Sequence, residues 1–343
     1  MKSSISVVFP LPCVPTTAIR IASSWKAAID AVHGREQGKS NVPATNEAWR
    51  RRAGSCRPQD TVRAAQEPAL TVFDHAVVNV LGGVEEAVAR YGRLGFRLTP
   101  RGYHTLGSIN HLAVFGSDYL ELLGYAPGER EKRAELWEHP AGLTGLALRT
   151  QDAAGLHAAM AEAGVAVEAC KDFSRPVEID GVQHEAAFRT FQLDRKAVAN
   201  GRIFFCQHKT PELIWRSEYQ DHPNGVTGIA GAFVVATRPS AIPDMLAAAP
   251  GLAREAEGVV RAGNTCLQFA SAEAIAAHFG VRGLPSLLGQ NMRMVGLELR
   301  SRDIAQTAAC LEAGGVPFER GAGWVQVDAD EAAGLILRFV AQD

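Results

Sequence analysis

The sequence predicts an α+β fold in which four βαβββ modules pair into two cup-shaped mixed sheets. Two observations carry this prediction. A helical stretch ends at a glycine and is followed by a strand at four places, namely Gly95, Gly164, Gly251 and Gly315. Around these junctions, short runs rich in β-branched residues alternate apolar and polar positions, which is typical of strands with one buried face. One repeated unit explains the whole pattern more simply than two unrelated domains.

The first module contains a strand, a helix and three further strands. These elements are expected at 70–80, 84–94, 96–99, 109–115 and 119–125. The second module repeats this order at 142–150, 153–164, 165–170, 188–193 and 202–208. The third begins with a strand at 226–236 and a helix at 242–249, and the fourth with a strand at 294–300 and a helix at 304–313. Each module covers one sheet face with its own helix, so two modules side by side enclose a concave face suited to a small molecule.

Composition limits the classes of function. The 343 residues are 47% hydrophobic and 21% charged, with a formal net charge of −2, which is the profile of a globular protein without an electrostatic footprint for nucleic acid. No apolar run approaches the ~20 residues that span a bilayer. The six cysteines form no CxxC pair, which favours reduced thiols and a cytoplasmic location. We therefore expect a small-molecule ligand, and neither a nucleic acid nor a membrane as partner.

Three parts of the chain are expected. Residues 1–68 carry an excess of basic groups and several prolines, which predicts a poorly ordered extension. Residues 69–225 hold the first two modules and the expected site. Residues 226–343 hold a second, degenerate pair, which would serve as scaffold or as the surface of a homodimer.

Five short segments carry a resemblance to a known superfamily. They are FDH at 73–75, GSINH at 107–111, YLELL at 119–123, FFCQH at 204–208 and HPNG at 222–225. In this order, on repeated βαβββ units, the sequence resembles the vicinal oxygen chelate superfamily, and within it the glyoxalase-like domain proteins of bacteria. That superfamily includes glyoxalase I, extradiol dioxygenases and bleomycin-resistance proteins. The resemblance covers about 70–225, and 226–340 by repeat pattern alone.

His75 and Glu121 are the first two candidate metal ligands. His75 shares a strand face with Phe73 and Val77 by the period of two, and it is either a hydrogen-bonded core residue or a ligand. Glu121 interrupts an apolar strand, where a carboxylate is costly to bury without a partner. It is either a ligand, an edge residue facing water or the partner of an arginine. The resemblance implies ligands on the first and last strands of a module, and it makes Glu121 the candidate catalytic residue.

His208 is the third candidate ligand. It ends the last strand of the second module in phase with Phe204 and Cys206, and the repeat predicts that it occupies the position equivalent to Glu121. A set of two histidines and one carboxylate suits Fe(II), Mn(II) or Zn(II) and leaves positions open for substrate. The alternatives are a solvent-facing His208 and a metal-free cup, because the first strand of the second module offers no fourth ligand.

Five further residues are candidates for substrate binding. His104 and Asn110 flank Gly107 in a loop that could close over the cup, and only one of Asn110 and His111 can face inward. Phe204 and Trp215 would form an aromatic wall. Two functions follow. One is a metal-dependent lyase, isomerase or dioxygenase acting on vicinal oxygens. The other is a metal-free binding or sequestering protein of the bleomycin-resistance type.

Overall fold

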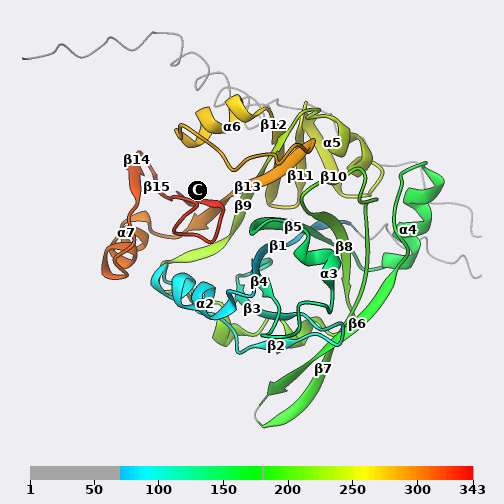
Figure 1. Cartoon of the computed structure of the whole chain (residues 1–343), viewed down its shortest axis with the longest axis horizontal. Coiled ribbons are helices and arrows are strands. Elements are labelled where there is room, and N and C mark those ends of the chain that lie inside the picture. Colours follow the sequence, from blue (N-terminus) through cyan, green and yellow to red (C-terminus); the bar gives the residue numbers. More distant parts are fainter. Residues whose placement is uncertain (1–69, 180, 343) are drawn as a thin grey trace, which may run out of the picture. The chain divides into compact units, whose positions relative to one another are not determined.

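The computed structural model describes residues 70–179 and 181–342, and these residues form one compact unit. The extension expected at residues 1–68 lies outside this range. The described chain is built on two eight-stranded mixed sheets (Figure 1). Each sheet is made of two βαβββ modules whose first strands pair antiparallel at its centre. The predicted fold class is confirmed.

The first sheet has the strand order β2-β3-β4-β1-β5-β8-β7-β6. Its first module consists of β1 (Val72–Leu81), α2 (Val84–Arg93), β2 (Gly102–Tyr103), β3 (Ile109–Val114) and β4 (Tyr119–Gly124). Its second consists of β5 (Gly142–Arg149), α4 (Ala153–Glu162), β6 (Lys171–Ile179), β7 (Val182–Gln192) and β8 (Arg202–His208). The short helix α3 (Ala134–Trp137) links the two modules, and two 3₁₀ turns (Pro211–Leu213 and Ser217–Tyr219) follow β8.

The second sheet repeats this order as β10-β11-β12-β9-β13-β16-β15-β14. The third module consists of β9 (Val226–Ala236), α5 (Ala241–Leu246), β10 (Leu252–Ala256), β11 (Val259–Ala262) and β12 (Thr265–Ala270). The fourth consists of β13 (Met292–Ser301), α7 (Ile304–Ala313), β14 (Glu319–Gly321), β15 (Trp324–Val327) and β16 (Ile336–Ala341). Helix α6 (Ala272–Phe279) is inserted between them. None of the helices in the described range is long and apolar enough to cross a membrane.

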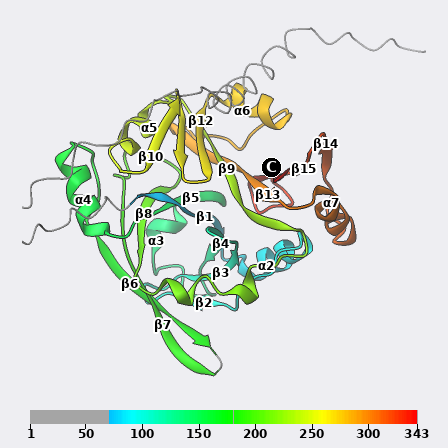
Figure 2. The same cartoon turned by 180° about the vertical axis from the view of Figure 1, so that it is seen from behind.

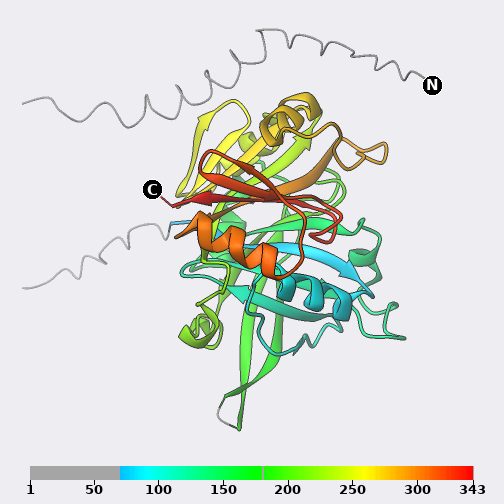
Figure 3. The ribbon, with the colours of Figure 1, turned by 90° about the vertical axis from the view of Figure 1, so that its left-hand side faces the viewer.

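Two strands differ from the prediction. No strand forms at 96–99, where Phe96 is buried in the core and Pro100 has no backbone N–H to donate to a ladder. At 165–170 only Val167 forms an isolated bridge, and β6 begins at Lys171 instead. Strand β6 is the edge strand of a long hairpin with β7 (Figure 3). Because only one residue of β6 is fully buried, its sequence has no apolar alternation to mark it.

One apolar core serves both sheets. Side chains from the central strands β1, β5, β9 and β13 enter the same buried cluster, for example Val78, Leu146, Val234 and Leu297. Figure 2 shows these strands crossing near the centre of the described chain. The buried faces of α2 and α4 join the same cluster. The opposite face of the first sheet is therefore free to form a cup.

The cup of the second sheet is filled by the chain itself. Ile275 and Phe279 of α6 pack with Phe233 and Val295 in a separate apolar cluster on the face opposite the shared core. A Cβ at Gly296 of β13 would come within 2.9 Å of the Phe279 ring. Helix α6 thus occupies the concave face of the second sheet. The corresponding face of the first sheet stays open.

Candidate functional site

The concave face of the first sheet encloses a cavity of about 90 Å³, which has room for several water molecules or a compact organic molecule. Its walls come from β1, β3, β4, the β6–β7 hairpin, β8 and the loop before β3. The polar lining includes His75, His104, Asn110, Glu121, Arg175 and Arg202, and the apolar lining includes Leu112, Leu123, Phe173, Phe188 and Phe204. Polar and apolar side chains contribute about equally to the lining, and a concave site with convergent polar groups is a candidate small-molecule site.

Strand register fixes which residues meet on the cavity floor. Across β4, β1, β5 and β8, one row of paired residues reads Glu121, Val77, Gly145 and Arg202, and the neighbouring row reads Tyr119, His75, Ala147 and Phe204. Small residues occupy the β5 positions, and a Cβ at Gly145 would lie 2.7 Å from Cβ of Val77. Glu121 and Arg202 therefore stand at opposite ends of one row, with small side chains between them.

A β-bulge places His75 in the cavity. The pairing of β1 with β5 shifts between Phe73 and His75, so Asp74 has no partner on β5. As a result Phe73 enters the shared core while His75 lines the cavity. The prediction that Phe73 and His75 share a face is wrong, because the extra residue breaks the period of two.

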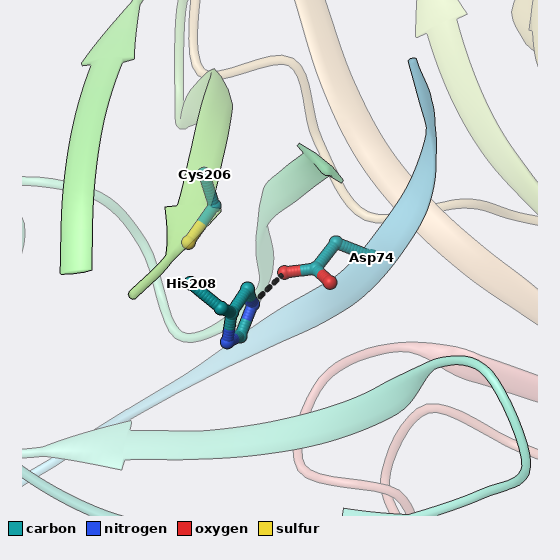
Figure 4. A group of neighbouring side chains, drawn as sticks. All are labelled: Asp74, Cys206 and His208. Carbon is teal, nitrogen blue, oxygen red and sulfur yellow. Dashed lines mark hydrogen bonds and ion pairs between the residues drawn. The ribbon is translucent and has the colours of Figure 1, made fainter. Parts of the chain in front are cut away.

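The carboxylate of Asp74 is completely buried and joins two histidines. Its Oδ2 accepts hydrogen bonds of 2.8 Å from His75 Nδ1 and from His208 Nε2; the second is drawn in Figure 4. Burial acts to raise the pKa of Asp74, but the two histidines outweigh it and hold that pKa below its usual value. The hydrogen bond to Nδ1 leaves His75 Nε2 directed toward Glu121. Metal-binding histidines commonly have this arrangement with a carboxylate behind them.

Glu121 lies in a polar corner of the cavity. Its Oε1 accepts a 2.6 Å hydrogen bond from Asn110 Nδ2, and its Oε2 is 3.8 Å from His75 Nε2. His104 Nε2 is 4.0 Å from Oε1. Burial acts to raise the pKa of Glu121, but the nearby His104 and His75 and the Asn110 hydrogen bond outweigh it and lower the pKa. Glu121 is therefore ionised at neutral pH.

His104 is neutral under the same conditions. Burial lowers the pKa of His104 to about 4, although the charge of Glu121 acts against this. Its Nδ1 is hydrogen-bonded to the Ser108 hydroxyl at 2.8 Å, and Asn110 Nδ2 lies 3.4 Å from Nε2. A neutral imidazole beside a carboxylate offers a nitrogen lone pair to the cavity.

The structure places His208 differently from the other two predicted ligands. The pairing of β5 with β8 ends at Arg149 and Cys206, so His208 lies beyond it, whereas Glu121 pairs within β1. In the row that runs from Glu121 on β4 across β1 and β5, the residue on β8 is Arg202. The expected equivalence of Glu121 and His208 is therefore not observed. The His208 ring packs on Trp215 and Phe188, outside the cavity lining.

His75 Nε2 thus lies 3.8 Å from Glu121 Oε2 across the cavity. His75 is connected to His208 only through Asp74, which is hydrogen-bonded to both histidines. Within residues 70–179 and 181–342, the one group of three whose ligand atoms all lie within 4.8 Å is Asp74, Cys206 and His208 (Figure 4). Burial raises the pKa of the Cys206 thiol well above its usual value, so this sulfur is protonated and a poor ligand.

The predicted substrate-binding residues fall into two groups. His104, Asn110 and Phe204 line the cavity. His111 lies outside the lining, with its Nδ1 hydrogen-bonded to the Thr99 carbonyl at 2.8 Å. Trp215 also lies outside it, beneath the guanidinium of Arg149.

Three residues of the site were missed by sequence reasoning. Asp74 adjoins His75 in the FDH segment, and its place before a candidate ligand was the available signal. Arg202 is in phase with Phe204 on β8, so the alternation used for His208 would also have found it. Arg175 lies on the exposed hairpin strand β6, where no pattern marks it.

Comparisons with known proteins agree with this architecture. A family model described as a glyoxalase-like domain matches residues 73–250, from β1 to beyond α5. A search of the curated proteins finds no match.

Solved structures share the fold at low sequence identity. A hypothetical protein from Staphylococcus aureus has 14% identity and a TM-score of 0.53, with 80% of this chain and 100% of that chain covered. A mutant of 4-hydroxymandelate synthase from Streptomyces coelicolor has 12% identity and a TM-score of 0.51, with 80% and 93% covered. At such identities the likeness concerns the fold alone.

Proposed function

We propose, because the chain belongs to the glyoxalase-like domain family of the vicinal oxygen chelate superfamily, that its first cup is a metal-dependent catalytic site for a small substrate with vicinal oxygens. The observation that carries the proposal is the 3.8 Å separation of His75 Nε2 and Glu121 Oε2 at the cavity, with His75 oriented from behind by Asp74.

The donor atoms fit a first-row divalent ion. Bonds of about 2.0–2.2 Å from an imidazole nitrogen and a carboxylate oxygen can meet at one ion when these atoms are 3.8 Å apart. The third ligand predicted from the sequence is His208, which would first have to release Asp74. His104 Nε2 already lies in the cavity near Glu121 and would have to give up only a long, 3.4 Å contact with Asn110 Nδ2. We therefore place Fe, Mn or Zn between His75 and Glu121, with His104 as the favoured third ligand.

The chemistry divides between the ion and the side chains. When bound, the ion would polarise two substrate oxygens and stabilise an enolate or similar anion. Glu121 is ionised and would accept a proton from a substrate carbon or hydroxyl beside it, and the Asn110 hydrogen bond keeps Oε1 fixed during this transfer. This role favours a lyase or isomerase, because such reactions depend on moving a proton next to a carbonyl group. Dioxygen activation would use the same ligands without needing the base.

Metal analysis tests the proposal. Protein purified without chelators and supplied separately with Fe(II), Mn(II) and Zn(II) should retain close to one ion per chain. His75→Gln should lose it, whereas Glu168→Gln, a substitution on the cavity rim at the partner of Arg195, should keep it. A wild-type chain that retains none of the three ions would overturn metal dependence and favour the metal-free binding protein.

A further inference from the structure

We propose that the substrate of this cup is an organic anion, and specifically a small carboxylic acid whose carboxylate is held by Arg175 and Arg202. The inference rests on the proposed function only in taking the cavity as the substrate site. It is carried by the charges of the cavity lining, which are not balanced within the described chain.

Half of the charged side chains around the cavity, histidines aside, are paired with each other. Five basic side chains line it, and two of them sit in ion pairs: Arg133 with Glu135 at 2.7 Å and Arg195 with Glu168 at 3.1 Å. A third, Lys171, is exposed to solvent. Glu121, the remaining carboxylate of the lining, is hydrogen-bonded to Asn110.

Arg175 and Arg202 are left over. The side chain of neither makes a hydrogen bond or ion pair with another residue in the described part of the chain, although both line the cavity. Arg175 is only 7% exposed. Burial lowers the pKa of both groups, that of Arg202 to about 10, so both remain charged at neutral pH. Arg202 is half-buried, and a partly buried charge without an ion-pair partner costs free energy that a bound anion would offset.

The Arg202 guanidinium is restrained before any ligand binds, and that of Arg175 lies against the backbone of β2. The Arg202 guanidinium lies 4.9 Å from the centre of the Phe204 ring, which restrains it through a cation–π contact. Arg175 passes over β2 at Gly102, where a Cβ would lie 3.1 Å from Arg175 Nη1. The planar fork of arginine matches the two oxygens of a carboxylate and binds them with paired, charge-assisted hydrogen bonds.

The position of the two arginines relates the anion to the reacting atoms. Arg202 occupies the same row of the floor as Glu121, at its other end. A carboxylate held there directs the rest of the molecule across the floor toward Glu121 and His75. The stacked rings of Phe173 and Phe188, with centroids 5.1 Å apart, form an apolar wall beside this path. The ligand is therefore a compact carboxylic acid with an apolar body.

Binding of simple probes to the full chain tests the inference. Isothermal titration calorimetry would compare benzoate and phenylglyoxylate with methyl benzoate, which has the same body without the charge, and with phenyl phosphate. We expect the carboxylates to bind and the ester not to. Arg202→Gln and Arg175→Gln should each weaken carboxylate binding by roughly tenfold to a hundredfold, the loss expected for charge-assisted hydrogen bonds. Arg254→Gln, at an exposed arginine that pairs with Asp244 outside the cavity lining, should leave it nearly unchanged.

The outcomes separate this inference from the proposed function. Circular dichroism checks that each variant folds, and Arg202→Lys, which keeps the charge without the fork, should retain part of the affinity. Metal content measured on the same samples reports on the proposed function independently. Carboxylate binding in a chain that retains no metal would support the inference while refuting metal dependence. Equal binding of ester and acid, or binding of phenyl phosphate alone, would overturn it.

Discussion

Asp74 and His75 are consecutive in β1, yet the Oδ2 atom of one accepts a 2.8 Å hydrogen bond from Nδ1 of the other. Consecutive side chains of a regular strand point to opposite faces, so this contact depends on the bulge at Asp74. The same oxygen also holds His208. The bulge thus places Phe73 in the shared core and His75 in the cavity, and it lets Asp74 reach His208 at the end of β8.

Replacing Asp74 by Asn should weaken both folding and metal binding. The amide cannot give the two histidines a charged acceptor, and breaking such a buried pair costs about 3–5 kcal/mol. Loss of the group that orients His75 should lower metal affinity roughly tenfold to a hundredfold. Urea unfolding and metal titration measure the two effects. Asp172→Asn removes an exposed carboxylate paired with Arg189 and serves as control; an equal loss in both variants would contradict the prediction.

Glu121→Gln should reduce metal retention strongly, because a neutral amide is a weaker ligand than a carboxylate. The isosteric change keeps the volume of the side chain, so the thermal midpoint should change little by comparison. Metal content after dialysis, measured by mass spectrometry, is the readout. Wild-type levels of bound metal in this variant would rule out ligation by Glu121.

His104→Gln and His208→Gln should differ in their effect on metal content. His104 Nε2 lies in the cavity near Glu121, whereas His208 Nε2 is already bonded to Asp74. We expect the first substitution to release the ion and the second to weaken it only indirectly, through Asp74 and His75. Parallel metal titrations decide between the two histidines, and the reverse order of affinities would assign the third ligand to His208.

Stability of the metal-free protein should fall as the pH decreases from about 6.5 to about 4. The pKa of His104 is about 4 in the folded chain and about 6.5 when unfolded, so the unfolded state binds more protons over this window. The shift corresponds to about 3 kcal/mol. His104→Gln should flatten the dependence measured by urea unfolding at several pH values. The exposed His184→Gln should not, and an unchanged slope in the first variant would refute the assignment.

Phe279→Ala should destabilise the protein by about 3–5 kcal/mol, because it empties a fully buried site in the second cup. Metal content in the first cup should stay at the wild-type level. Leu288→Ala, at a side chain that is 55% exposed, is the matched control for chemical unfolding. A change in stability no larger than that of the control would mean that α6 does not seal the second cup.

The module order was predictable because its signals are local. Gly95, Gly164, Gly251 and Gly315 all have positive φ angles, a conformation that favours glycine, and the sequence shows glycine at each place. His75 and Glu121 were identifiable as polar residues within apolar strands.

The rest of the site depends on register, which no local pattern records. The bulge at Asp74 changed the face of Phe73, and the pairing of β5 with β8 put Arg202 where His208 was expected. Arg175 reaches the cavity from an exposed hairpin, so only the folded chain reveals it.

The filled second cup has a consequence for stoichiometry. Gly145 and Gly296 hold matching places, since each follows a register shift and pairs with the neighbouring first strand, at Val77 and Phe233 respectively. Above Gly296, the ring of Phe279 acts as a tethered ligand whose effective concentration is of the millimolar order or higher. A free molecule would have to displace the chain's own helix to enter there. Each chain should therefore saturate at one bound ligand, despite carrying two cups of the same design.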